Sequence, residues 1–86
     1  MPGGATQVFS REFDAVLARL PVAQRTLLLA RITGLGQRLA SSPHYRMTGR
    51  GEYRLRVGDY RVIYDFEVAR NELYLLTLGH RREVYR

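Results

Sequence analysis

The sequence contains no cysteine, no lysine and no tryptophan, and only two histidines among its 86 residues. Without cysteine the chain can form no disulfide, thiolate metal site or cysteine nucleophile, and two histidines are too few for a histidine-rich metal cage. We therefore expect no metal and no cofactor. A domain of this size buries only about 60% of its unfolded surface, so its stability must come from one packed core.

Long hydrophobic runs are also absent. No apolar stretch approaches the ~20 residues of a membrane span, and the first residues lack the basic and apolar regions of a signal peptide. We expect a cytoplasmic protein with no membrane partner. The composition, 45% hydrophobic and 26% charged, excludes a disordered chain and predicts a single domain over residues 1–86, with a flexible lead-in at 1–6.

Charge is the most informative property of the composition. Fourteen basic and eight acidic residues give a net charge of +6, which indicates a polyanionic partner. All fourteen basic residues are arginine, whose planar fork matches phosphate geometry. Codon bias in a GC-rich genome is enough to explain the absence of lysine, but it does not explain where the arginines lie.

The first half of the chain has a helical period. Gln7–Phe9 is predicted to form a short strand, and Ser10 can cap a following helix. Pro21 separates this helix from a second one that ends at Ser41. The apolar stripes of the two helices are Phe13, Val16, Leu17 and Leu20, then Leu28, Ile32, Leu35 and Leu39.

From Glu52 onward the period changes to two. Two strands joined by Gly58-Asp59 form a predicted hairpin, and Leu73–Leu78 reads as a buried central strand. The hairpin places Tyr53, Leu55, Val57, Tyr60, Val62 and Tyr64 on one face. We predict an α+β fold in which an N-terminal strand and a helical hairpin pack on one face of a curved antiparallel sheet, leaving the other face open and basic.

The open face carries the candidate site. A two-residue turn places Arg56 opposite Arg61 and Arg54 opposite Ile63. Like charges across a ladder are destabilising, and Asp65 is the one acid on this face to offset them, so an anionic ligand is expected. The alternative is a solvated outer face, where charged residues are common.

The C-terminal tail adds a second basic cluster, with Arg81 and Arg82. His80 and Tyr85 are the two titratable groups beside it that could act as a base on a hydroxyl. His44 has no comparable context and is predicted to lie in a loop.

These elements resemble a known family. The helix, helix, three-stranded sheet order, with Glu52–Tyr64 and Gly79–Tyr85, resembles the RelE toxins of bacterial and archaeal toxin–antitoxin systems over Val8–Tyr85. The resemblance implies a RelE-like, microbial ribonuclease-type fold. It also implies cleavage of messenger RNA in the ribosomal A site, by metal-free attack of a ribose 2′-hydroxyl on the adjacent phosphodiester.

The resemblance implies roles for the arginines. Arg54 and Arg56 match a basic strand pair that is often lysine in the family. Arg61 matches an arginine that clamps the scissile phosphate, and Arg81 matches one that stabilises the transition state or the leaving group. Arg82 is expected to bind RNA together with Arg54, Arg56 and Arg61.

The resemblance also implies which residue acts as the general base on the ribose 2′-hydroxyl. Tyr85 resembles a C-terminal tyrosine that acts as general base, although some relatives have a longer interval after the residue matched by Arg81. His80 stands where a basic residue is common and is the alternative base.

Two other functions stay open. ParE-like relatives share the fold and bind DNA gyrase without nuclease chemistry, although they typically lack the full basic set. A basic RNA-binding module without catalysis would need aromatic platforms on the arginine face, where the hairpin places no tyrosine. The expected partners of a nuclease are a RelB-like antitoxin, acidic or helical, and the ribosome with its message. Operator DNA is expected only through the antitoxin.

Overall fold

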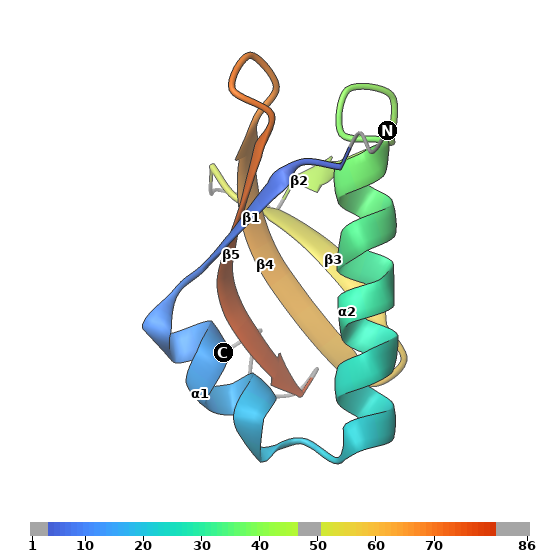
Figure 1. Cartoon of the computed structure of the whole chain (residues 1–86), viewed down its shortest axis with the longest axis vertical. Coiled ribbons are helices and arrows are strands. Elements are labelled where there is room, and N and C mark those ends of the chain that lie inside the picture. The colour runs from blue at the N-terminus through green and yellow to red at the C-terminus, as the bar shows by residue number, and fades with distance from the viewer. Residues whose placement is uncertain (1–3, 47–50, 81–86) are drawn as a thin grey trace.

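The computed structural model of the chain describes residues 4–46 and 51–80. Within these residues the chain forms two helices and a five-stranded sheet (Figure 1). The elements are β1 (Thr6–Phe9), α1 (Arg11–Arg19), α2 (Val22–Gln37), β2 (Tyr45–Arg46), β3 (Tyr53–Val57), β4 (Tyr60–Glu67) and β5 (Glu72–His80). No described helix is long and apolar enough to cross a membrane.

The strands lie in the order β1-β5-β4-β3-β2, and the two helices lie on the same side of the sheet (Figure 1). The predicted α+β class is therefore confirmed. The sheet is mixed rather than wholly antiparallel, because β1 pairs in parallel with β5. β2 was not predicted; it adds a short antiparallel edge to β3.

Ser10 links the end of β1 and the start of α1 to β5. Its backbone amide donates to the Leu75 carbonyl at 3.0 Å and its hydroxyl donates to the Leu76 carbonyl at 2.7 Å. The same hydroxyl oxygen accepts from the Phe13 amide at 3.0 Å, as the predicted N-cap should. The start of α1 is thus tied to the middle of β5, directly after the point where β1 ends.

Helix α2 ends earlier than its apolar period predicts. The helix stops at Gln37 rather than Ser41, and the chain continues in turns. Gly36 lies where α2 meets the start of β1: its carbonyl accepts from the Ala5 amide at 3.2 Å. A Cβ atom on Gly36 would lie 3.4 Å from the Ala5 nitrogen. The helix and the strand therefore lie close together at this point.

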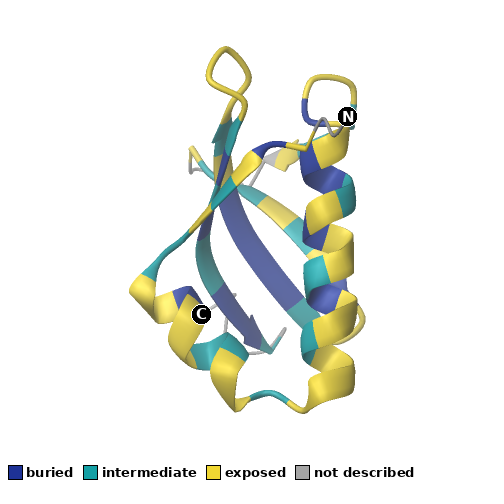
Figure 2. Cartoon of the chain, in the orientation of Figure 1, coloured by how far each residue is buried: buried dark blue, intermediate teal, exposed yellow. Residues whose placement is uncertain are grey.

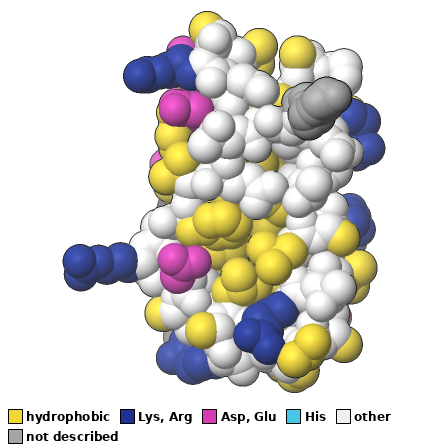
Figure 3. Space-filling view, in the orientation of Figure 1, with side chains coloured by type: hydrophobic (Ala, Val, Ile, Leu, Met, Phe, Trp, Pro, Cys, Tyr) yellow, Lys and Arg dark blue, Asp and Glu magenta, His cyan; other side chains and the backbone are white. Residues whose placement is uncertain are grey.

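The core lies between the helices and the sheet, as Figure 2 shows by the buried strand surface behind them. α1 packs against β5 and α2 packs against β3. Apolar side chains also gather near the middle of the face seen in Figure 3. The predicted core is confirmed, because its members are buried or packed against the buried cluster: Phe13, Leu17, Leu28, Ile32, Tyr53, Leu55, Val57, Tyr60, Val62 and Tyr64. Leu73, Leu75 and Leu78 of β5 complete it.

The hairpin of β3 and β4 has the predicted register. Val57 pairs with Tyr60 and Arg56 with Arg61 across the Gly58-Asp59 turn. Gly58 has a φ of +60°, and among described non-glycine residues only Asn71 has a positive φ. A positive φ at the first central residue alone is the pattern of a type II′ turn, whose twist matches that of the strands.

We predict that Gly58→Ala lowers the free energy of unfolding by about 1 kcal/mol, because alanine is strained at this positive φ. Gly51→Ala is the control, since Gly51 is exposed, does not share this φ, and a Cβ atom added there would meet no described atom within 4 Å. Urea denaturation of both variants measures the difference. Equal stability of the two variants would contradict the turn assignment.

Candidate functional site

Three arginines share the sheet face that the helices leave uncovered. Arg54 and Arg56 project from β3, and Arg61 projects from β4 directly opposite Arg56. Their apolar neighbours Leu55 and Val57 point to the other side, toward the helices. The predicted gathering of the three arginines on one face is therefore what the strand pairing produces. Arg54 and Arg56 are exposed.

Arg61 differs from the expectation of a solvent-exposed side chain, because only 4% of it is accessible. Its Nη1 donates to the Tyr60 carbonyl at 3.2 Å and lies 3.4 Å from the Gly58 carbonyl. The guanidinium therefore bends back over the hairpin turn. This arrangement holds the charge in one place, so Arg61 also contributes to the local structure of the turn.

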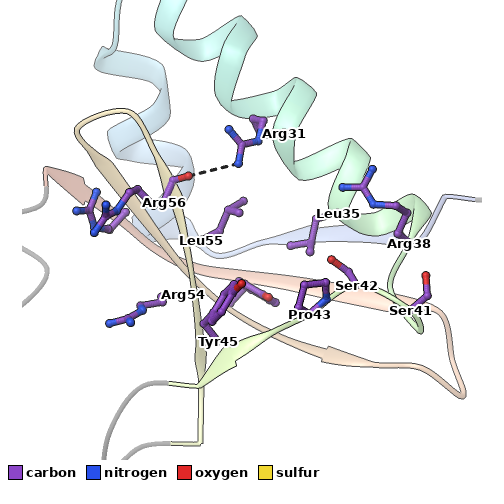
Figure 4. A pocket seen from close by; sticks show the side chains of 12 residues that line it. Arg31, Leu35, Arg38, Ser41, Ser42, Pro43, Tyr45, Arg54, Leu55 and Arg56 are labelled. Carbon is purple, nitrogen blue, oxygen red and sulfur yellow. Dashed lines mark hydrogen bonds between the residues drawn. The ribbon is translucent and has the colours of Figure 1, made fainter.

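A cavity of about 590 Å³ lies along α2 and the β2–β3 edge of the sheet (Figure 4). Its lining includes arginines from three elements and the connection before β2, and no described lining residue is acidic. Arg31 joins the two walls: its Nη2 approaches the Arg56 carbonyl at 3.5 Å. The lining arginines are Arg31, Arg38, Arg54, Arg56 and Arg61.

Arg31 and Arg38 were not among the predicted site residues. They are seven residues apart on or just after α2, so helical periodicity places them on one side. The seven-residue spacing of Arg31 and Arg38 can be read from the sequence. The sequence did not predict β2, the edge strand near which these two arginines lie. The structure thus extends the basic region around the edge of β3.

The acidic side chains of the open face lie away from these arginines. Asp65 pairs with Tyr74 of β5 and accepts from the Phe66 amide at 2.8 Å. Within residues 4–46 and 51–80, the one ion pair joins Arg70 and Glu72, at 3.7 Å. Arg31, Arg38, Arg54 and Arg56 form none with the described residues. Asp65, the one acid of this face that could offset the arginine charge, therefore forms no ion pair with these arginines.

His80 lies away from the arginine row. It pairs with Tyr60, and the two rings meet edge to face with centroids 6.0 Å apart. Tyr60 packs against the core, so the register places His80 on the helix side of the sheet. Gly79, not His80, lies opposite Arg61. Three further predicted site residues, Arg81, Arg82 and Tyr85, lie outside the described residues.

His44 has a structural role that the sequence did not indicate. It stacks on Phe66 with centroids 4.1 Å apart. Its Nε2 is 2.8 Å from the Leu39 carbonyl, which can only accept, so Nε2 carries the proton. Nδ1 then accepts from the Tyr64 hydroxyl at 2.6 Å. Both ring nitrogens are satisfied, and the connection leading into β2 is fixed to the core.

Tyr64 is the buried partner in this pair. It is 1% exposed and lines the base of the cavity. Burial, with a smaller contribution from the nearby Tyr53, raises the pKa of Tyr64 to about 12. The folded protein therefore favours the neutral phenol, which is the form that can donate to His44.

The fold and the arginine face together define a small basic α+β protein. Residues 6–85 match the family model described as the ParE toxin of the type II toxin–antitoxin system parDE. This chain therefore belongs to that toxin family, within the RelE/ParE superfamily. The resemblance predicted from the sequence is confirmed at this level. No curated protein sequence matches the chain.

RelE toxins and RelE–RelB complexes are among the solved structures with the same fold. A chain of the RelBE2 toxin–antitoxin complex from Mycobacterium tuberculosis superposes with a TM-score of 0.73 at 21% identity, covering 96% of this chain and 98% of that one. The archaeal RelE–RelB complex from Pyrococcus horikoshii gives 0.73 at 24% identity, with 93% and 98% covered. The isolated E. coli RelE toxin gives 0.74 at 15% identity, with 94% and 90% covered. At these identities the likeness establishes the fold.

We predict that the folded state loses stability between about pH 10 and 12 through Tyr64. A pKa raised from 10.0 to about 12 means that its contribution is fully present below pH 10 and is lost as the pH rises through 12. The loss should be about 2 kcal/mol, measured by urea denaturation across this range. Tyr64→Phe should flatten the dependence, whereas Tyr45→Phe, at an exposed site, should not. An equal pH dependence in wild type and Tyr64→Phe would contradict the assignment.

Proposed function

We propose that this toxin cleaves messenger RNA on the ribosome. The observation that carries the proposal is the arginine row, in which Arg56 lies opposite Arg61 and beside Arg54, with no acid among the described residues of the adjoining cavity. The exposed guanidinium groups of Arg54 and Arg56 form no ion pair with the described residues, and a bound phosphate would offset their charge. The RelE fold of the solved relatives supports the same reading.

The proposed reaction uses the ribose 2′-hydroxyl as nucleophile. Its oxygen bonds to the adjacent phosphorus while the bond to the 5′-oxygen breaks, leaving a 2′,3′-cyclic phosphate. A base takes the 2′-hydroxyl proton, and the leaving 5′-oxygen takes a proton from water. Arginine never deprotonates, so Arg54, Arg56 and Arg61 would hold the phosphate oxygens and stabilise the charge that develops.

The remaining roles fall on the C-terminal segment. Arg81 would stabilise the transition state and Arg82 would bind RNA, as the family resemblance implies. Of the two candidate bases, His80 is beside Tyr60 on the helix side, which favours Tyr85. The RNA supplies its own nucleophile, so the reaction as proposed requires no metal.

A second candidate function is inhibition of DNA gyrase by binding. The family model that matches residues 6–85 carries the name of the ParE toxin, and this observation favours it. The two candidates differ in their product: one generates new RNA ends on ribosomes, and the other blocks supercoiling without cutting RNA.

We predict that Arg56→Ala and Arg54→Ala each slow cleavage of ribosome-bound message by about 10²- to 10³-fold, because each removes a charged donor aimed at the phosphate. Both side chains are exposed, so the melting temperature should change little. Arg11→Ala on α1 is the charge-matched control. Primer extension on purified, programmed ribosomes measures the rate. Absence of new 5′ ends with wild type, together with blocked gyrase supercoiling, would replace the nuclease by the ParE-like function.

We also propose an antitoxin partner that is acidic or helical and covers the arginine face. The relatives named above include toxin–antitoxin complexes, and the exposed side chains of Arg54 and Arg56 offer a complementary surface. Any operator DNA would be contacted through this partner.

We predict that the chain expressed alone stops cell growth. Co-expression with the neighbouring gene, which we expect to encode the antitoxin, should restore growth and yield a complex of the two proteins. Its dissociation constant should rise with salt, because rim charges are screened. Arg54→Ala should reduce the salt dependence, whereas Arg11→Ala should not. Isothermal titration at low and at high salt checks this, and an adjacent gene that neither restores growth nor forms a complex contradicts it.

A further inference from the structure

Tyr45 is an exposed aromatic residue next to the arginine row. It is 61% accessible and is the register partner of Arg54 across β2 and β3. Side chains of directly opposed residues lie on the same face of a sheet. Tyr45 therefore stands on the open face beside Arg54, and it contributes to the cavity lining (Figure 4).

The preceding residue fixes this orientation. His44 is anchored on the opposite, core side by its stacking on Phe66 and its hydrogen bonds to Tyr64 and Leu39. His44 directly precedes β2, so this anchor holds the start of the strand in place, and the register with Arg54 puts Tyr45 on the open face. The ring of Tyr45 forms no hydrogen bond or ring contact with the described residues. Tyr45 therefore presents an exposed aromatic ring that is held in position and makes no such contact with the described residues.

We propose that Tyr45 stacks on a base of the single RNA strand whose phosphates lie along Arg54 and Arg56. The proposal rests on the RNA-binding function proposed above. Arg54 and Arg56 are two residues apart, or about 7 Å along the strand, so a nucleic-acid backbone following β3 would pass both guanidinium groups. Tyr45 lies at the Arg54 end of this path and presents its ring there. An aromatic ring beside cationic groups is the combination that single-strand binding surfaces use.

A contact with the antitoxin is the competing explanation for an exposed tyrosine. The charge around the ring favours RNA, since its cross-strand neighbour is Arg54 and no described lining residue of its cavity is acidic. Tyr74 provides a comparison on the same sheet face. It pairs with Asp65, and its hydroxyl donates to Glu72. Tyr74 thus has the same side chain in an acidic setting, which would repel phosphate.

The test compares two labelled RNA hexamers, one with bases and one abasic, by fluorescence anisotropy on the purified full chain. Tyr45→Leu should weaken binding of the base-containing RNA by about tenfold, within the range of one stacked base. It should leave the abasic RNA unchanged. Tyr45→Phe keeps the ring and should bind within about twofold of wild type. Tyr74→Leu is the matched control and should leave both affinities unchanged.

A second measurement uses only the wild-type chain and Tyr45→Leu. A 2-aminopurine base moved along the hexamer should lose fluorescence on binding at the position that stacks, and Tyr45→Leu should restore the signal. Absence of quenching at every position would overturn the proposal. So would equal weakening of both hexamers by Tyr45→Leu, failure of the wild type to bind either hexamer, or a Tyr45→Leu defect confined to antitoxin binding.

The outcome for Tyr45 is separable from the outcome for cleavage. If wild type cuts no message but its base-dependent RNA binding requires Tyr45, the stacking role stands and the nuclease fails. If wild type cuts message and Tyr45→Leu cuts and binds equally well, the nuclease stands and the stacking role fails.

Discussion

The two-residue turn at Gly58-Asp59 is the constraint on which the site depends. A type II′ turn sets the register of β3 against β4, and a slip of one residue would exchange the two faces of the hairpin. In the observed register the aromatic and aliphatic side chains of both strands enter the core, except Ile63, which lies opposite Arg54 on the arginine face. The arginines are left on the other face as a consequence. Core packing and charge placement are therefore determined together, because the energy gained by burying one face fixes the composition of the other.

The edge strand β2 depends on a different interaction. His44 satisfies both ring nitrogens through Tyr64 and Leu39 and stacks on Phe66. A buried polar network of this kind is stabilising only when every member is paired, and it fixes where the chain leaves α2 and joins the sheet. The position of β2, in turn, determines the wall of the cavity that lies opposite α2. A half-buried histidine attached to the core thus shapes the surface on which Tyr45 lies.

Local patterns in the sequence were enough to predict the hairpin register, the core faces of both helices and the Ser10 cap. Each depends on periodicity or on a turn of few residues. The features that were missed depend on contacts between distant segments. β2 has two residues, too few to show a period, and His44 acquires its partners only when β4 lies beside it. The burial of Arg61 also escaped prediction, because strand alternation gives the face of a side chain but not how far it bends toward backbone carbonyls.

The arginine face combines donors of two kinds. Arg61 is held by the carbonyls of the turn, so its guanidinium is preorganised and loses little conformational entropy when an anion arrives. Arg54 and Arg56 are exposed and must be ordered by the ligand. A loss of function at Arg61 would therefore mix a structural effect with a chemical one, whereas Arg54 and Arg56 report on the ligand more directly. Guanidinium groups at phosphates and a ring at a base face recognise features common to all RNA sequences. On this surface alone, the choice of cleavage point would thus be set by whatever presents the strand, which for a ribosome-bound message is the ribosome.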